Sequence, residues 1–223
     1  MDTRMELQKR VNLLKADHEL FEPGELGVVL EIELRDKAGN VKEAWKKKSE
    51  SFTRQFFDLL LVQALNAPDM HPLQMTDITG SVRDIAMHNQ SFQANGGVGD
   101  IANGIVVGTG QVAPTISDYA LGAQVAHGSA AGQLQYGGMT FGLPTSSLTT
   151  SSFTLTRVFS NASGSSITIY ELGVLANGYT VRPDAGQARG LFRFMTIRDV
   201  IGPGIVIQNG ESLTVNYRYQ GVI

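Results

Sequence analysis

Cysteine is absent from the 223-residue sequence. Disulfide bonds, thiolate zinc sites, iron–sulfur clusters and thiol catalysis are therefore excluded, and the composition suits a reducing compartment. A surplus of basic residues is also missing, because the formal net charge is −3. General nucleic-acid binders carry a strongly basic surface that neutralises phosphates, so we expect no direct nucleic-acid partner.

Long apolar runs are absent as well. The longest run, residues 59–62, is far shorter than the roughly 20 residues of a membrane-spanning helix. The chain starts Met1, Asp2, Thr3 and Arg4 without the apolar segment of a secretory signal, so we expect neither secretion nor a membrane partner. Hydrophobic residues still make up 42% of the chain, which is enough for a packed core.

Charged residues are concentrated near the N-terminal end. Residues 1–54 hold 11 of the 18 Lys and Arg and 11 of the 21 Asp and Glu. Soluble domains carry about a quarter charged residues, and the remainder of this chain carries far fewer. This low density favours a surface that other protein subunits cover in an assembly. The alternative is a monomeric β-sandwich that its many Ser and Thr residues keep soluble.

Residues 1–25 are predicted to form an N-terminal arm with a short helix. Leu7, Val11 and Leu14 recur with helical spacing, and Pro23 and Gly24 interrupt the pattern. Such a helix either packs on its own domain or binds a partner, and the pattern leaves both possibilities open.

Residues 26–223 are predicted to form a single β-rich domain. Alternating apolar side chains indicate strands at 27–35, 41–48, 152–159, 166–175, 191–200 and 213–217, with turn residues such as Asn209-Gly210 between them. Helical spacing predicts one buried helix over about 51–65, with Phe56 and Leu60 in the core. Together these elements predict a mainly β fold, an antiparallel β-sandwich of jelly-roll type.

Residues 95–142 contain 12 Gly, with short β segments at 105–107, 124–126 and 133–141. We predict an extended loop region here. Ordering so many glycines costs much conformational entropy, so such a loop needs a partner surface to hold it.

The motifs of nucleotide binding are incomplete. Residues 97–102 match the dinucleotide pattern Gly-x-Gly-x-x-Gly/Ala, but the strand before it and the helix after it are not predicted. Residues 108–110, Gly-Thr-Gly, lack the Lys of a phosphate-binding loop. The lysines Lys46, Lys47 and Lys48 lie opposite a strand rich in Glu, which favours a solvated sheet edge over a phosphate site. No cofactor is expected.

The sequence also predicts no catalytic or metal-binding residues. The four histidines are not spaced as metal ligands, and no Gly-x-Ser-x-Gly motif is present. Strands could bring a pair of acidic residues together for glycoside hydrolysis, but nothing in the sequence favours such a pair. The residues considered are His18, His71, His88, His127, Glu171, Glu211, Asp184 and Asp199.

A series of segments resembles a recurrent part of tailed-bacteriophage virion proteins. The resemblance covers roughly residues 75–220 and depends on the order and spacing of its parts, since each part alone is a simple β-turn-β pattern. The segment 113–121, for example, reads Ala-Pro-Thr-Ile-Ser-Asp-Tyr-Ala-Leu. The other segments are 105–110, 126–128, 153–157, 161–164, 167–174, 198–200 and 209–217.

The resemblance implies a non-enzymatic structural subunit of a phage particle, synthesised in the bacterial cytoplasm and located in the virion. Our first interpretation is a capsid accessory or decoration protein. Its partners would be other virion proteins and copies of itself, and a trimer would suit the threefold positions of an icosahedral shell. The alternatives are a tail, baseplate or fibre subunit with a host-contact role and a carbohydrate-binding β-sandwich. Tyr217 and Tyr219 share a strand face, where we expect core or interface residues rather than a sugar platform.

Overall fold

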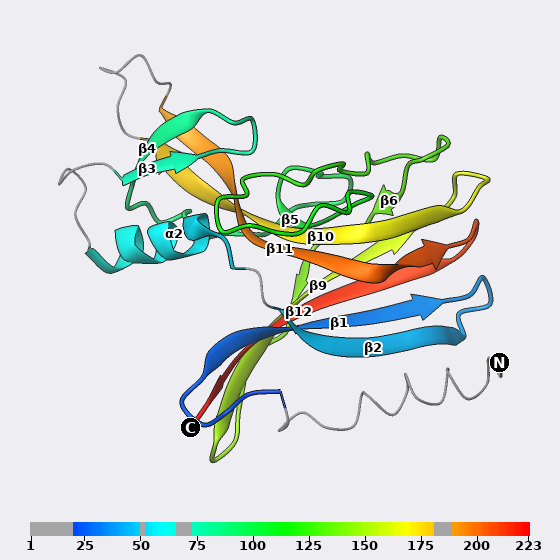
Figure 1. Cartoon of the computed structure of the whole chain (residues 1–223), viewed down its shortest axis with the longest axis horizontal. Coiled ribbons are helices and arrows are strands. Elements are labelled where there is room, and N and C mark those ends of the chain that lie inside the picture. The colour runs from blue at the N-terminus through cyan, green and yellow to red at the C-terminus, as the bar shows by residue number, and fades with distance from the viewer. Residues whose placement is uncertain (1–19, 50–51, 66–72, 181–188) are drawn as a thin grey trace. The chain divides into compact units, whose positions relative to one another are not determined.

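The computed structural model describes residues 20–49, 52–65, 73–180 and 189–223 (Figure 1). Among the described residues, strands account for 52% and helix for 6%, and the sheets are antiparallel. The predicted mainly β, antiparallel fold with one helix is therefore confirmed. Most of the predicted arm, residues 1–19, lies outside the described residues. Within the described ranges, no helix is long and apolar enough to cross a membrane.

The chain forms two compact units, each made from discontinuous segments. Unit 1 comprises residues 1–50, 126–168 and 206–223, and unit 2 comprises residues 51–125 and 169–205. The local sequence patterns predict one domain over residues 26–223. Two units arise because strands that are distant along the chain pair with each other, which local patterns do not reveal.

Unit 1 is built on a seven-stranded sheet in the order β2-β1-β12-β9-β6, with β7 and β8 also paired to β9. Leu30, Ile32 and Leu34 are buried on one face of β1, while Glu31 and Glu33 point to the other face and are half-buried, as the alternation predicts. The strands are β1 (Leu26–Arg35), β2 (Val41–Ser49), β6 (Gln135–Tyr136), β7 (Thr140–Phe141), β8 (Thr145–Ser146), β9 (Thr150–Ser160) and β12 (Ser212–Val222).

The predicted hairpin of β1 and β2 is confirmed, and Asp36 shapes its turn by accepting hydrogen bonds from the backbone N–H groups of Ala38 and Asn40. On its other side β1 pairs with β12, and β12 in turn pairs with β9. Tyr217 of β12 is fully buried, so it is a core residue of this unit.

Unit 2 contains a five-stranded sheet in the order β11-β10-β4-β3, with β5 also paired to β10. All residues of β5 are buried. The β segment predicted at 105–107, within the Gly-rich segment 95–142, is therefore confirmed as a core strand, paired with β10. The strands are β3 (Leu73–Thr76), β4 (Val82–Ala86), β5 (Gly104–Gly108), β10 (Ile167–Thr180) and β11 (Gly190–Ile207).

Helix α2 (Arg54–Leu65) contacts β3 and β4 within unit 2. Its inner side carries Leu59 and Val62, which are buried, whereas Leu60 is 50% exposed and Leu61 is 46% exposed. The prediction of a helix near 51–65 is confirmed, but the prediction that Leu60 is a core residue is wrong. The helix packs with one side only, so its second apolar stripe remains in solvent.

Candidate functional site

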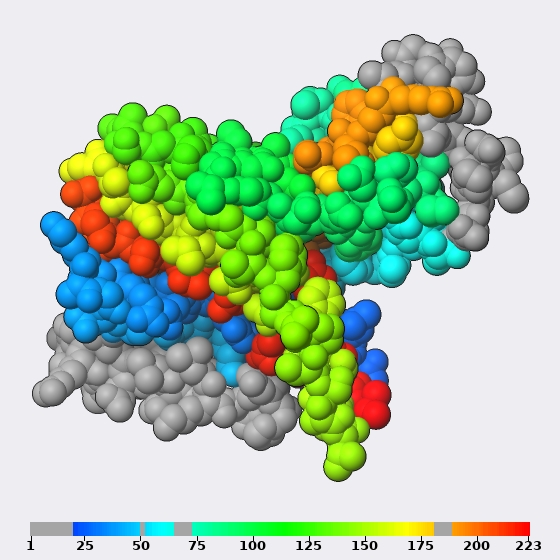
Figure 2. Space-filling view, turned by 180° about the vertical axis from the view of Figure 1, so that it is seen from behind, coloured from blue at the N-terminus to red at the C-terminus, as the bar shows by residue number. Residues whose placement is uncertain are grey.

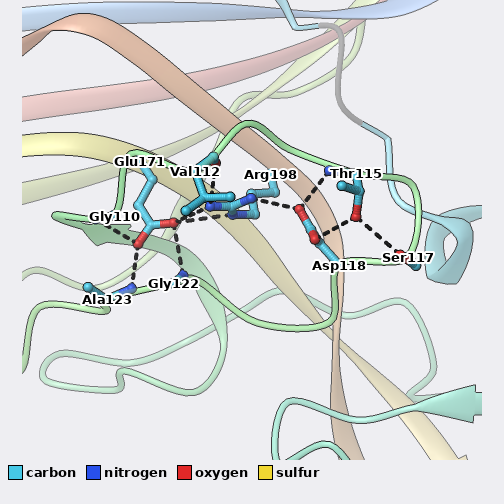
Figure 3. Close-up of polar contacts among 9 residues, drawn as sticks. All are labelled: Gly110, Val112, Thr115, Ser117, Asp118, Gly122, Ala123, Glu171 and Arg198. Carbon is cyan, nitrogen blue, oxygen red and sulfur yellow. Dashed lines mark hydrogen bonds and ion pairs between the residues drawn. The ribbon is translucent and has the colours of Figure 1, made fainter.

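The candidate site is the loop of residues 109–123, which follows β5 and which we call the pinned loop (Figure 3). Its two ends meet, because the N–H group of Thr109 donates to the carbonyl of Ala123 at 2.8 Å and Gly108 bridges to Gln124. Between these ends the chain forms no helix or strand. The loop nevertheless has a fixed path, because side chains from β10 and β11 hold it.

Glu171 of β10 holds both ends of the pinned loop. Its side chain is fully buried, and its carboxylate accepts backbone N–H groups from Gly110 at 3.0 Å, Gly122 at 3.0 Å and Ala123 at 2.7 Å. Converging N–H groups of this kind form an anion-binding concavity. Here the bound anion is a carboxylate of the protein itself.

The Gly-Thr-Gly segment 108–110 is explained by this carboxylate. A Cβ atom added at Gly108 or Gly110 would lie 2.5 Å from Oε1 of Glu171. The two glycines therefore leave room for the carboxylate to approach the backbone. This segment lacks the Lys of a phosphate-binding loop, and the carboxylate of Glu171 lies where an external anion would have to sit.

Arg198 of β11 joins Glu171 to Asp118 of the loop, and we call these three residues the anchor. Nη2 of its guanidinium lies 2.8 Å from Oε2 of Glu171 and 3.0 Å from the carbonyl oxygen of Val112. Nη1 lies 2.7 Å from Oδ2 of Asp118, which belongs to the loop. Asp118 in turn accepts the backbone N–H of Thr115 at 2.8 Å and its hydroxyl at 2.7 Å. One buried cation thus joins both carboxylates and ties the middle of the loop to the sheet.

The surroundings of both carboxylates favour their charged forms. Burial alone raises the pKa of Glu171, but the N–H groups of Ala123 and Gly122 and the guanidinium of Arg198 outweigh burial and lower that pKa below its ordinary value. Burial likewise raises the pKa of Asp118, while Thr115 and Arg198 lower it further than burial raises it. The pKa of Arg198 is raised by its two carboxylate partners despite the opposing effect of burial.

These pKa directions decide what the cluster can do chemically. A general acid or base needs a pKa near the working pH and a lone pair or proton that can reach a substrate. Glu171 is a buried carboxylate whose two oxygens already accept hydrogen bonds from three N–H groups and from Arg198. This arrangement is suited to positioning the loop.

The pinned loop presents apolar side chains to solvent. Val112 is 75% exposed, Ile116 is 60% exposed and Tyr119 is 42% exposed. The backbone carbonyl of Ile116 accepts the N–H of Arg54 at 2.8 Å, so the start of α2 fixes this part of the loop as well. A rigid loop with exposed apolar side chains is suited to binding another protein surface.

Where the structure describes them, the residues considered from the sequence do not gather into one site. The ring of His88 stacks on Tyr179 at 4.1 Å, and Nδ1 of His127 accepts the N–H of Tyr136 at 3.0 Å. Glu211 forms an ion pair with Lys42. His18, His71 and Asp184 lie outside the described residues, and among the residues that the structure describes no group of three or more His, Asp or Glu could hold a metal ion.

The other sequence motifs have structural surroundings of their own. Residues 97–102 are followed by strand β5, so the helix that a dinucleotide site requires does not follow them. Lys48 pairs with Glu25 at 2.8 Å, whereas Lys46 is buried, so the prediction of a solvated edge is wrong for Lys46. The ring of Tyr219 stacks in parallel on Phe153, with 4.9 Å between the ring centroids.

Sequence reasoning did not identify Arg198 and Asp118 as an anchor for Glu171. A signal was present in the strand alternation, because Glu171 follows Ile167 and Ile169 on the inward face of β10. A charged residue at a core position of a strand needs a buried partner, and Arg198 is a buried residue of β11. Nothing local to residue 118 shows that it would reach either strand.

Comparison with known proteins identifies no relative of this chain. No family model matches the chain, and no curated protein or solved structure gives a significant match to it.

Proposed function

We propose that this chain is a non-enzymatic structural subunit of a tailed-phage particle, acting as a capsid accessory protein that stabilises the shell. The observation that carries the proposal is the pinned loop, in which a buried Glu171–Arg198 pair keeps exposed apolar side chains at Val112 and Ile116 in fixed positions. Preorganised apolar loops lose little entropy on binding, so they suit permanent contacts between subunits.

Two features of the sequence support the same function. The low charge density after residue 54 suits a surface that neighbouring subunits cover. The resemblance of residues 75–220 to tailed-phage virion proteins supplies the setting in which such contacts form. The carboxylate of Glu171 is saturated with hydrogen bonds from the backbone of the pinned loop. This supports a role for Glu171 in positioning the loop.

The test is to find the chain in particles of the phage that encodes it. Mass spectrometry of purified particles should detect the chain in many copies, and an electron-microscopy map should place it on the outer surface of the capsid. Density for the chain in the tail or baseplate would replace the capsid role with that of a tail subunit. Absence of the chain from purified particles would overturn the proposal.

A further inference from the structure

A second exposed apolar surface lies in unit 1, on the hairpin of residues 140–153, which we call the β8–β9 arm. Residues 140–149 are all exposed. Leu148 is 95% exposed, Leu143 is 86% exposed and Phe141 is 52% exposed. Figure 2 shows this hairpin in yellow-green, extending past the ends of the neighbouring blue and red strands. Leucine side chains so fully in solvent indicate a surface that another protein covers.

The arm has a defined structure despite its exposure. β7 and β8 both pair with β9, and hydroxyl groups hydrogen-bond across the hairpin. The oxygens of Ser146 and Ser151 lie 2.9 Å apart, and those of Ser147 and Thr150 lie 2.8 Å apart. The arm is therefore a preformed element that can dock without first having to fold.

The arm carries no charge. Residues 119–156 contain no Asp, Glu, Lys or Arg. Exposed edge strands usually carry charged residues that prevent contact with other chains. Their absence here means that the arm can be covered without burying a charge, provided that the covering surface is also uncharged.

Residues 109–117 of the pinned loop meet this condition. They hold no charged residue, and the nearest one, Asp118, forms an ion pair with Arg198. Two other groups of exposed apolar side chains have an acidic residue beside them. Leu60 and Leu61 follow Asp58 in α2, and Val98 and Ile101 flank Asp100.

We propose that the β8–β9 arm of one copy docks on the pinned loop of a second copy of this chain. Within one chain both surfaces are exposed, so each copy can offer its arm to one neighbour and its loop to another. A head-to-tail contact of this kind generates a closed ring when its rotation closes. The inference deepens the proposed function, on which its biological setting rests, by naming the contact through which copies assemble.

The oligomeric state of the purified chain provides the first test. Sedimentation velocity should find an oligomer for the wild type and a monomer for both Leu148→Asp and Val112→Asp, because either change buries a charge in the contact. Val98→Asp is the matched control: Val98 is 81% exposed but lies outside both surfaces, so this variant should remain oligomeric. A monomeric wild type, or equal dissociation of the three variants, would overturn the proposal.

Cysteine cross-linking tests which surfaces meet. Because the chain has no native cysteine, only the introduced cysteines can form disulfides. A mixture of Leu148→Cys and Val112→Cys proteins should form disulfide-linked dimers after mild oxidation, and the double variant should form a ladder of larger species. The Leu148→Cys/Val98→Cys protein should not form that ladder. Dimers of Leu148→Cys alone, at the yield of the mixture, would show that arm meets arm and would overturn the proposal.

The two proposals fail separately. If particles contain the chain but the purified wild type is monomeric, the docking inference fails and the structural function stands. If the ring forms but particles lack the chain, the proposed function fails and the docking contact stands.

Discussion

The pinned loop and the β8–β9 arm present the same kind of surface but are held in different ways. The loop has no strand pairing between residues 109 and 123, and buried charges fix it from the sheet beneath. The arm has no charged residue, and backbone pairing with β9 fixes it from within. The comparison shows that an exposed apolar surface can be preorganised either by a buried ionic anchor or by a strand ladder.

The two solutions differ in what they require from the sequence. A ladder needs only residues that tolerate extended backbone, so Ser and Thr suffice in the arm. An ionic anchor needs specific residues at distant positions, here Asp118, Glu171 and Arg198, and glycines that admit the carboxylate. Single substitutions should therefore disrupt the loop far more than the arm.

The largest effect is expected for Glu171→Ala. Removing one partner of a buried ion pair costs about 3–5 kcal/mol, because the remaining charge stays buried without its partner. Urea unfolding should show this loss of unfolding free energy, with faster hydrogen exchange at Gly110, Gly122 and Ala123. The control Glu33→Ala removes a half-exposed pair with Arg35 and should cost no more than about 1 kcal/mol. Equal losses for both variants would contradict the anchoring role.

Acid should loosen the loop before the arm. The pKa values of Glu171 and Asp118 are lowered in the folded protein, so their stabilising contribution is complete above the unfolded pKa values, roughly 4. It is lost as the pH falls through the lower, folded values. Hydrogen exchange at decreasing pH, corrected for the intrinsic rate, should show loss of protection at Gly122 before residues 140–153. Simultaneous loss in both regions would argue against this linkage.

A smaller effect is expected for Gly110→Ala. The added methyl group would lie 2.5 Å from Oε1 of Glu171, and relieving such overpacking costs about 1–3 kcal/mol. Gly97→Ala is the control, because its Cβ atom would meet nothing within 4 Å. Thermal or urea unfolding measures the loss of unfolding free energy in each of the two variants. Unchanged stability of Gly110→Ala would mean that the carboxylate has room to move.

The smallest effect is expected for Leu148→Ser, measured at a protein concentration low enough to keep the chain monomeric. A side chain that is 95% exposed has almost no folded-state contacts to lose, so the unfolding free energy should change by less than about 0.5 kcal/mol. At high concentration the same variant should be less stable than the wild type, because association stabilises only the native form. A large loss in the dilute monomer would show that the arm packs within its own chain.

Local patterns in the sequence predicted the elements of the fold well. The alternation in residues 27–35 and 41–48 matches β1 and β2, and Asn209-Gly210 lies between β11 and β12 as the turn signal indicated. Such signals succeed because alternation and turn preference depend on neighbouring residues. The burial of Leu60 was predicted wrongly, since the apolar spacing of α2 does not say which of its two apolar stripes faces the sheet.

Local sequence patterns could not predict the anchor of the pinned loop. Asp118, Glu171 and Arg198 lie far apart along the chain, and only the paths of β10, β11 and the loop bring them together. The same limit applies to the two units, which depend on pairing between strands at opposite ends of the sequence. The sequence shows the glycines Gly108 and Gly110, but their role is to leave room for Glu171. No residue near them in the sequence indicates that this carboxylate lies against them.

The pairing of β1 with β12 also sets the order in which this protein can fold during synthesis. Leu26 pairs with Gly221 and Arg35 with Ser212, so β1 leaves the ribosome long before its partner exists. Unit 2 is complete once residue 205 has emerged, before any part of β12. Until then the apolar face of the β1–β2 hairpin remains open to chaperones and to other nascent chains. The unit that begins first along the chain is therefore the one that closes last.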